Sequence, residues 1–126
     1  MTVTTMLMKL HDFWATPGLP VWLEGHAPDA QAAPYLLYTA GKGDFGEPSA
    51  VTATAWFSGA HAATQRQHFA LVAERMLPQA GVRIITTGGM LLLDRPKDGV
   101  FLSLTADEND PALLGLRIHA TLRVYG

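Results

Sequence analysis

The chain has 126 residues, 48% of them hydrophobic, which fits a single domain with one hydrophobic core. Charged residues make up only 16%, below the roughly 25% of an average globular protein, and this favours a surface that is partly covered by oligomerisation. The net charge of −2 and the lack of a basic run argue against sequence-specific nucleic-acid binding.

Cysteine is absent, which excludes disulfides, thiol catalysis and thiolate metal sites. Residues 1–14 lack the pattern of a secretion signal, and no apolar run approaches the roughly 18 residues of a membrane span. We therefore expect a protein made in the cytosol that has no membrane partner.

A short helix is predicted over residues 4–15, where apolar side chains recur at helical spacing and Thr4 or Thr5 is available as the cap. The Thr-Pro-Gly sequence that follows ends this helix. A short strand is predicted over residues 21–25, and the segment rich in Ala, Pro and Asp at residues 26–33 is predicted to be a loop.

Two strands joined by a glycine-rich loop are predicted next. Residues 34–40 are mainly aromatic and aliphatic, and residues 50–58 alternate between apolar side chains and Thr, Trp or Ser. With the loop at residues 41–48, these strands form a predicted β-hairpin. Trp56 lies on the threonine side of its strand, so we expect it to be the tryptophan nearest to an interface.

The most regular helix is predicted over residues 61–77. Its buried stripe is predicted to consist of Phe69, Val72, Ala73, Met76 and Leu77.

The last third of the chain is predicted to consist of strands at residues 82–87, 90–94, 100–105 and 114–125. Gly88 and Gly89 are predicted to form a tight turn, and an acidic turn is predicted before the last strand. That strand has the clearest period-two pattern of the sequence, with one apolar and one polar face. The order of elements predicts an α+β domain, in which a mainly antiparallel (mixed) sheet is packed by two helices.

The glycine-rich loop contains a literal G-x-G-x-x-G motif at residues 41–46. A dinucleotide site needs this motif to open a helix whose N-terminus binds the pyrophosphate, and an acidic residue roughly 20 positions later. Here a predicted strand follows, and no acidic residue lies between Glu47 and Glu74. We therefore predict a hairpin loop and no cofactor.

No spacing typical of a metal or catalytic site is found. His61 and His68 are two helical turns apart, about 10 Å along the axis, which is too far for one metal ion. No serine lies in a G-x-S-x-G motif or has an evident His and Asp partner in the sequence. We therefore expect no metal, no catalytic residue and no enzymatic activity.

The polar face of the last strand suits a contact with another protein, because Arg and Tyr are over-represented at binding hot spots. The alternative interpretation is an ordinary solvated sheet face. The candidate interface residues are Trp56, Arg117, His119, Arg123 and Tyr125, with Lys42 and Phe45 in the glycine-rich loop.

Several short stretches, in this order, are typical of one family of proteins. They are the leading helix, Pro34-Tyr35-Leu36-Leu37-Tyr38 before the glycine-rich loop, Ala55-Trp56-Phe57-Ser58 before the long helix, the segment from Gly88 to Arg95, and the closing Arg123-Val124-Tyr125. This arrangement covers nearly the whole chain and resembles the tail terminator and neck (head–tail connection) proteins of long-tailed bacteriophages, including the lambda-type terminator.

The resemblance implies a structural protein that forms a homo-oligomeric, hexameric ring and contacts tail-tube and neck proteins. It also implies a bacterial cytoplasmic location during assembly and a place in the virion afterwards. Three alternatives remain. One is another minor tail or capsid component of the same fold, one is a small-molecule-binding domain or enzyme that uses the glycine-rich loop at 41–46, and one is a generic oligomeric adaptor in a cellular pathway.

Overall fold

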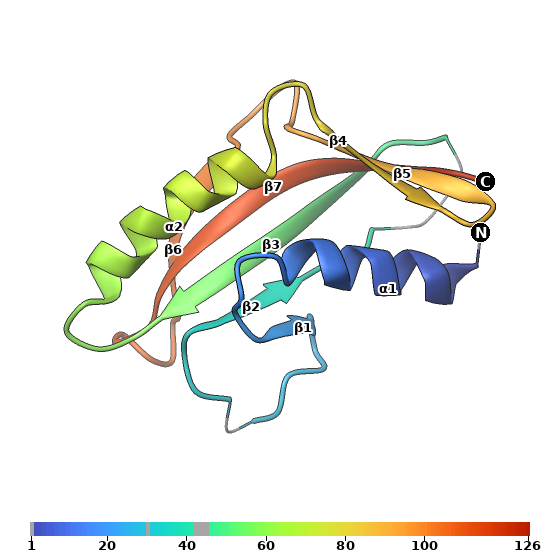
Figure 1. Ribbon diagram of the computed structural model, residues 1–126. Coiled ribbons are helices and arrows are strands. Elements are labelled where there is room, and N and C mark those ends of the chain that lie inside the picture. Colours follow the sequence, from blue (N-terminus) through green and yellow to red (C-terminus); the bar gives the residue numbers. More distant parts are fainter. Residues whose placement is uncertain (1, 30, 42–45) are drawn as a thin grey trace.

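The computed structural model describes residues 2–29, 31–41 and 46–126, which form two helices and a seven-stranded sheet (Figure 1). The predicted α+β class is confirmed. The elements in chain order are α1 (Val3–Trp14), β1 (Val21–Leu23), β2 (Tyr35–Tyr38), β3 (Ser49–Phe57), α2 (Ala62–Met76), β4 (Val82–Thr86), β5 (Gly89–Asp94), β6 (Leu102–Ala106) and β7 (Leu114–Tyr125).

The sheet has the strand order β1-β2-β3-β7-β5-β4, and β6 also pairs with β7. Only β1 and β2 are parallel among these pairs, so the sheet is mixed but mainly antiparallel, as predicted. The predicted hairpin is present, because β2 and β3 pair antiparallel on either side of the glycine-rich loop.

The long strand β7 is the centre of the sheet. One of its edges pairs with β3 along residues 114–122, and its other edge is shared by β6 at residues 114–118 and β5 at residues 121–125. Strands β5 and β6 are therefore two halves of one interrupted strand. The interruption is residues 95–101, which we call the excursion segment.

The excursion segment differs from the sequence-based prediction. A strand was expected at residues 100–105, but the strand is Leu102–Ala106. Seven residues (95–101) stand opposite only His119 and Ala120 of β7, so most of the segment must leave the plane of the sheet. Phe101 still accepts a backbone hydrogen bond from His119, with an N···O distance of 2.8 Å.

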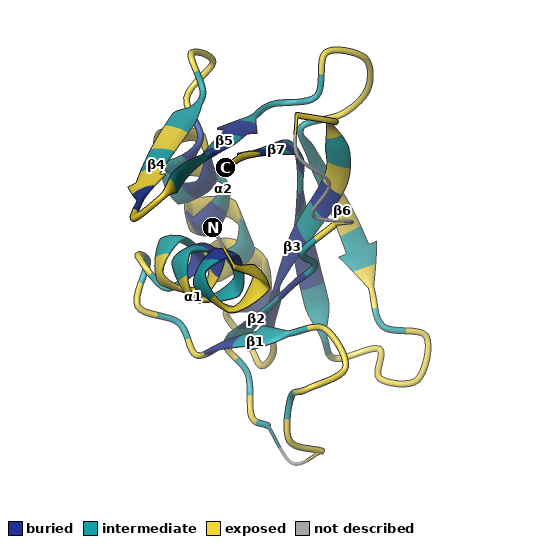
Figure 2. Ribbon diagram, turned by 90° about the vertical axis from the view of Figure 1, so that its right-hand side faces the viewer, coloured by how far each residue is buried: buried dark blue, intermediate teal, exposed yellow. Residues whose placement is uncertain are grey.

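The core lies between the helices and one face of the sheet. Both helices lie on the same side of the β3–β7 pair, and the residues that face them are buried (Figure 2). The predicted alternation is confirmed in both strands. The helix-facing residues are Val51, Ala53, Ala55 and Phe57 in β3, and Leu116, Ile118, Ala120, Leu122 and Val124 in β7.

The first helix begins earlier than expected. Thr2, not Thr4 or Thr5, is its N-cap, because the Thr2 side chain accepts a hydrogen bond from the Thr5 N–H at 3.1 Å. Met6, Leu10 and Trp14 then follow one another at a spacing of four and form the buried stripe. In α2, Phe69, Ala73 and Leu77 are buried and Val72 and Met76 are partly buried, in line with the predicted stripe.

The turn between β4 and β5 lies one residue earlier than predicted. Thr86 pairs with Gly89, so the two loop residues are Thr87 and Gly88, and Gly89 belongs to the strand. Gly88 has a φ of +81°, and it is the loop position that needs a glycine.

Candidate functional site: the helix-free face of the sheet

The face of the sheet opposite the helices brings most of the predicted interface residues together. Thr54 pairs with Arg117, Thr52 pairs with His119, and Trp56 pairs with Gly115. Arg123 and Tyr125 continue the same face toward the end of β7. Lys42 and Phe45 lie outside the described residues. The role of all these residues in an interface stays a prediction.

Hydrogen bonds from the neighbouring strands hold two side chains in the middle of this face. Arg117 Nε donates to Thr54 Oγ1 at 3.0 Å, and His119 Nε2 lies 2.8 Å from Ser103 Oγ. The central part of the face is therefore ordered before any partner binds, which lowers the entropic cost of binding.

The structure places one serine beside a histidine, Ser103 beside His119, which the sequence did not indicate. The two residues are 16 positions apart and become neighbours only because β6 pairs with β7. Among the described residues, His119 has no carboxylate as a hydrogen-bond partner.

Only 9% of the surface of Trp56 is exposed, so little of this side chain is available to a partner. It packs over the bare backbone of Gly115. A Cβ atom at Gly115 would lie 2.9 Å from Trp56 Cζ3 and 2.7 Å from Thr105 Cγ2. Glycine is therefore required at this position of β7, and the space above it is occupied by the indole ring.

Replacing Gly115 with alanine is expected to lower the free energy of unfolding by about 1–3 kcal/mol, because the added methyl group overpacks the contact with Trp56 and Thr105. Urea denaturation of both proteins measures this loss. The double variant Gly115→Ala/Thr105→Ser removes the nearer methyl group and should recover part of the stability. An unchanged midpoint for Gly115→Ala would contradict the packing argument.

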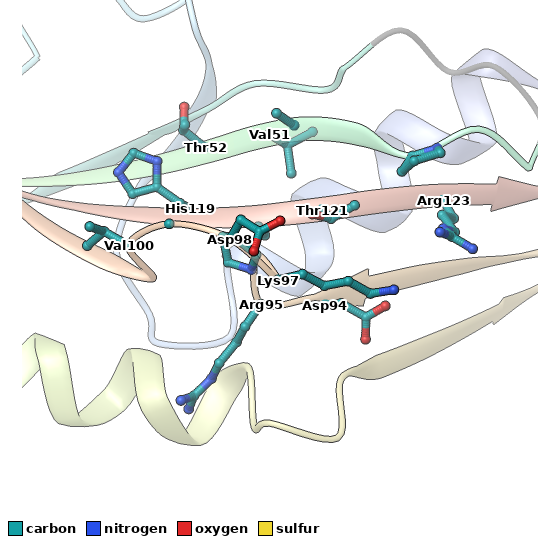
Figure 3. A pocket seen from close by; sticks show the side chains of 15 residues that line it. Val51, Thr52, Asp94, Arg95, Lys97, Asp98, Val100, His119, Thr121 and Arg123 are labelled. Carbon is teal, nitrogen blue, oxygen red and sulfur yellow. The ribbon is translucent and has the colours of Figure 1, made fainter.

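A cavity of about 560 Å³ opens where the excursion segment leaves the sheet (Figure 3). Its floor is formed by β3 and β7, and its wall by the excursion segment. Five charged residues line it: Asp94, Arg95, Lys97, Asp98 and Arg123. The sequence pattern did not predict this cavity, because it exists only through the interruption between β5 and β6.

Arg95 fixes the excursion segment to the rest of the fold. Its Nε donates to the carbonyl of Leu77 at 2.7 Å and its Nη2 donates to the carbonyl of Glu74 at 3.2 Å, both at the end of α2. The guanidinium also lies 4.1 Å from the centroid of the Phe101 ring. Figure 3 shows the side chain turned toward α2 and away from Lys97 and Arg123.

The glycine-rich loop leads into a strand. Gly41 and Gly46 have positive φ angles of +67° and +74°, and the Gly46 N–H donates to the Val124 carbonyl at 2.7 Å. The next element is β3, so the loop does not open a helix that could present its N-terminus to a phosphate group.

The acidic turn before β7 is built by its own carboxylates. Asp107 Oδ1 accepts from the Asn109 N–H at 2.8 Å and from the Asp110 N–H at 3.2 Å, and Asp110 Oδ1 accepts from the Ala112 N–H at 3.0 Å. The turn lies near β2: burial raises the pKa of the Tyr35 hydroxyl, and the negative charges of Asp107 and Asp110 raise it further.

Within the described part of the chain, no group of three or more His, Asp and Glu side chains is arranged to hold a metal ion. Neither of its helices is long and apolar enough to span a membrane. No protein-family model matches the sequence, and comparisons with curated proteins and with solved structures give no match either.

Proposed function

We propose that the protein is a structural component of a bacteriophage or prophage tail, a tail terminator or head–tail connection protein, that acts by assembling into a ring of identical subunits. The ring is proposed to be hexameric, to form in the bacterial cytoplasm and to become part of the virion. Its partners are copies of itself and the tail-tube and neck proteins.

The observation that carries this proposal is the helix-free face of the sheet. Along β7 it presents arginine, histidine and tyrosine side chains, of which Arg117 and His119 are held by neighbouring strands. Such residues are typical of protein interfaces. The sheet also ends in unlike edges, with β1 on one side and β4 and β6 on the other. A ring needs two different surfaces on each subunit, because its contacts are heterologous.

The proposal is tested by adding the purified chain to growing tail tubes made from the tail-tube protein encoded in the same gene cluster. The expected result is a ring at one end of each tube and a halt in tube growth, both seen by electron microscopy. Terminase, portal and tail-tube genes beside the gene would support the same conclusion. Tubes that keep growing, with the chain unbound, would contradict it.

A second candidate function, the binding of a small molecule, is favoured by the cavity. Its volume of about 560 Å³ lies within the range of ligand pockets, roughly 300–1,000 Å³. Pro48, at the end of the glycine-rich loop, is part of its lining. Saturable binding of a nucleotide or metabolite that is lost in both Ala50→Phe, which fills the cavity, and Gly43→Ala would favour this function over assembly.

A further inference from the structure

The end of the helix-free face that lies farthest from the acidic turn carries two rows of aligned side chains. In the register of β4, β5 and β7, each β5 residue of a row stands between one β4 residue and one β7 residue. Leu91 and Leu93 of β5 are buried on the helix side, so their neighbours face the other way. We call these six residues the end patch: Arg83-Leu92-Arg123 and Ile85-Met90-Tyr125.

The composition of the end patch is that of an interface. Four apolar or aromatic side chains lie together beside two arginines, and Arg, Tyr and Met are enriched in interface cores. Ile85 is 72% exposed and Tyr125 is 36% exposed. Among the described residues, the one ion pair joins His11 and Asp12, so neither arginine of the patch has an ion-pair partner among them.

The acidic turn has the complementary charge. Asp107, Glu108 and Asp110 bring three carboxylates together, and none of them is ion-paired within the described chain. Because Asp107 and Asp110 fix the turn through their own hydrogen bonds, the turn presents these charges on a defined backbone. An acidic, preformed turn and a patch with two arginines attract each other.

The two surfaces cannot meet within one molecule. The acidic turn leads into the first residue of β7, whereas the end patch includes Arg123 and Tyr125 at its last residues. A strand of 12 residues is about 36 Å long at a rise of about 3.3 Å per residue. Figure 1 shows β7 crossing the molecule and ending beside the β4–β5 hairpin.

We infer that the end patch of one copy binds the acidic turn of a second copy, head to tail. This inference rests on the proposed assembly function and names the contact that would produce it. A contact between two different surfaces leaves one free surface of each kind at the ends of a dimer, so further copies can add in the same way. The copies form a closed ring when the rotation from one copy to the next adds up to a full turn.

The absence of cysteine makes disulfide trapping a direct test. One variant carries Ile85→Cys in the end patch, and the other carries Asn109→Cys, which leaves all three carboxylates of the turn in place. When the two full-length variants are mixed in equal amounts and oxidised, the mixed disulfide dimer should exceed the two homodimers together, because random pairing alone would make half of the dimers mixed. Leu71→Cys, at a 55% exposed position on α2, replaces Ile85→Cys as the background control.

Charge reversal tests whether the arginines cause the contact. Arg83→Glu with Arg123→Glu in the Ile85→Cys chain should lower the yield of mixed dimer roughly tenfold. Adding Glu108→Arg to the Asn109→Cys chain should recover part of that yield. The same substitutions without cysteine should weaken self-association in sedimentation velocity.

Three outcomes would overturn the inference. A mixed dimer no more abundant than the Leu71→Cys background, in a protein that sediments as an oligomer, would refute this contact and leave the assembly function standing. A predominant Ile85→Cys homodimer would place two end patches face to face. A wild-type chain that stays monomeric and gives no mixed dimer, and that also leaves tail tubes uncapped, would refute the contact and the assembly function together.

Discussion

Replacing Trp14 with alanine is expected to lower the free energy of unfolding by about 3–5 kcal/mol, the range typical of a buried tryptophan. Trp14 is 1% exposed and ends the buried stripe of α1. Its ring packs edge-on against Phe13, with 4.8 Å between the ring centroids. The truncation leaves a cavity between α1 and the sheet that the surrounding side chains cannot fully close. Urea denaturation followed by circular dichroism measures the loss.

Trp14→Phe is the matched control. The indole N–H of Trp14 is buried, and within the described residues it has no hydrogen-bond partner. A buried polar group without a partner costs about 1–3 kcal/mol, so removing it offsets part of the packing that phenylalanine loses. We therefore expect Trp14→Phe to cost much less than Trp14→Ala. Equal losses for the two variants would show that the indole N–H has a partner in the folded protein.

The second large effect is expected for Arg95→Ala, with a loss of about 2–3 kcal/mol. The substitution removes the hydrogen bonds from the guanidinium to the carbonyls of Leu77 and Glu74, and the contact with the Phe101 ring. Hydrogen bonds to charged groups contribute about 1.5–3 kcal/mol each. The bond to the Glu74 carbonyl is exposed to solvent and contributes less, so the expected loss is smaller than twice this range. The same denaturation measurement applies.

Arg95→Lys separates charge from geometry. Lysine keeps the positive charge but cannot reach two carbonyls and stack on an aromatic ring at the same time. We expect Arg95→Lys to restore less than half of the stability that Arg95→Ala loses. Hydrogen exchange at residues 95–101 should accelerate in both variants, because Arg95 ties the excursion segment to the end of α2. Wild-type stability and exchange in Arg95→Lys would contradict this role.

Most of the sheet could be predicted because its strands have one buried and one open face. In β7 the alternation of apolar and polar residues defined both ends of the strand and the side of every residue. The stripe of α2 was predicted equally well, since Phe69, Ala73 and Leu77 repeat at helical spacing. Local errors arose where nearby residues of the same type were equally suitable. Thr2 caps the first helix instead of Thr4 or Thr5, and Gly88 without Gly89 belongs to the turn between β4 and β5.

The candidate site was predicted only in part. Arg117, His119, Arg123 and Tyr125 share one strand, so the period of two placed them on one face. Residues on other strands could not be added to that face, because the sequence does not state which strands pair. Ser103 and the β4 and β5 residues of the end patch were therefore missed, and they became part of the face only through the register of β4, β5 and β6.

The sequence by itself determined the α+β class, the number and order of the main elements and the side on which each residue of β3 and β7 lies, because these depend on local periodicity and turn residues. The tertiary structure alone decided that β5 and β6 share one edge of β7 and that residues 95–101 leave the sheet between them. It also decided that the acidic turn and the end patch lie at opposite ends of one strand. These features depend on pairing between distant segments, which side-chain patterns along the chain do not encode.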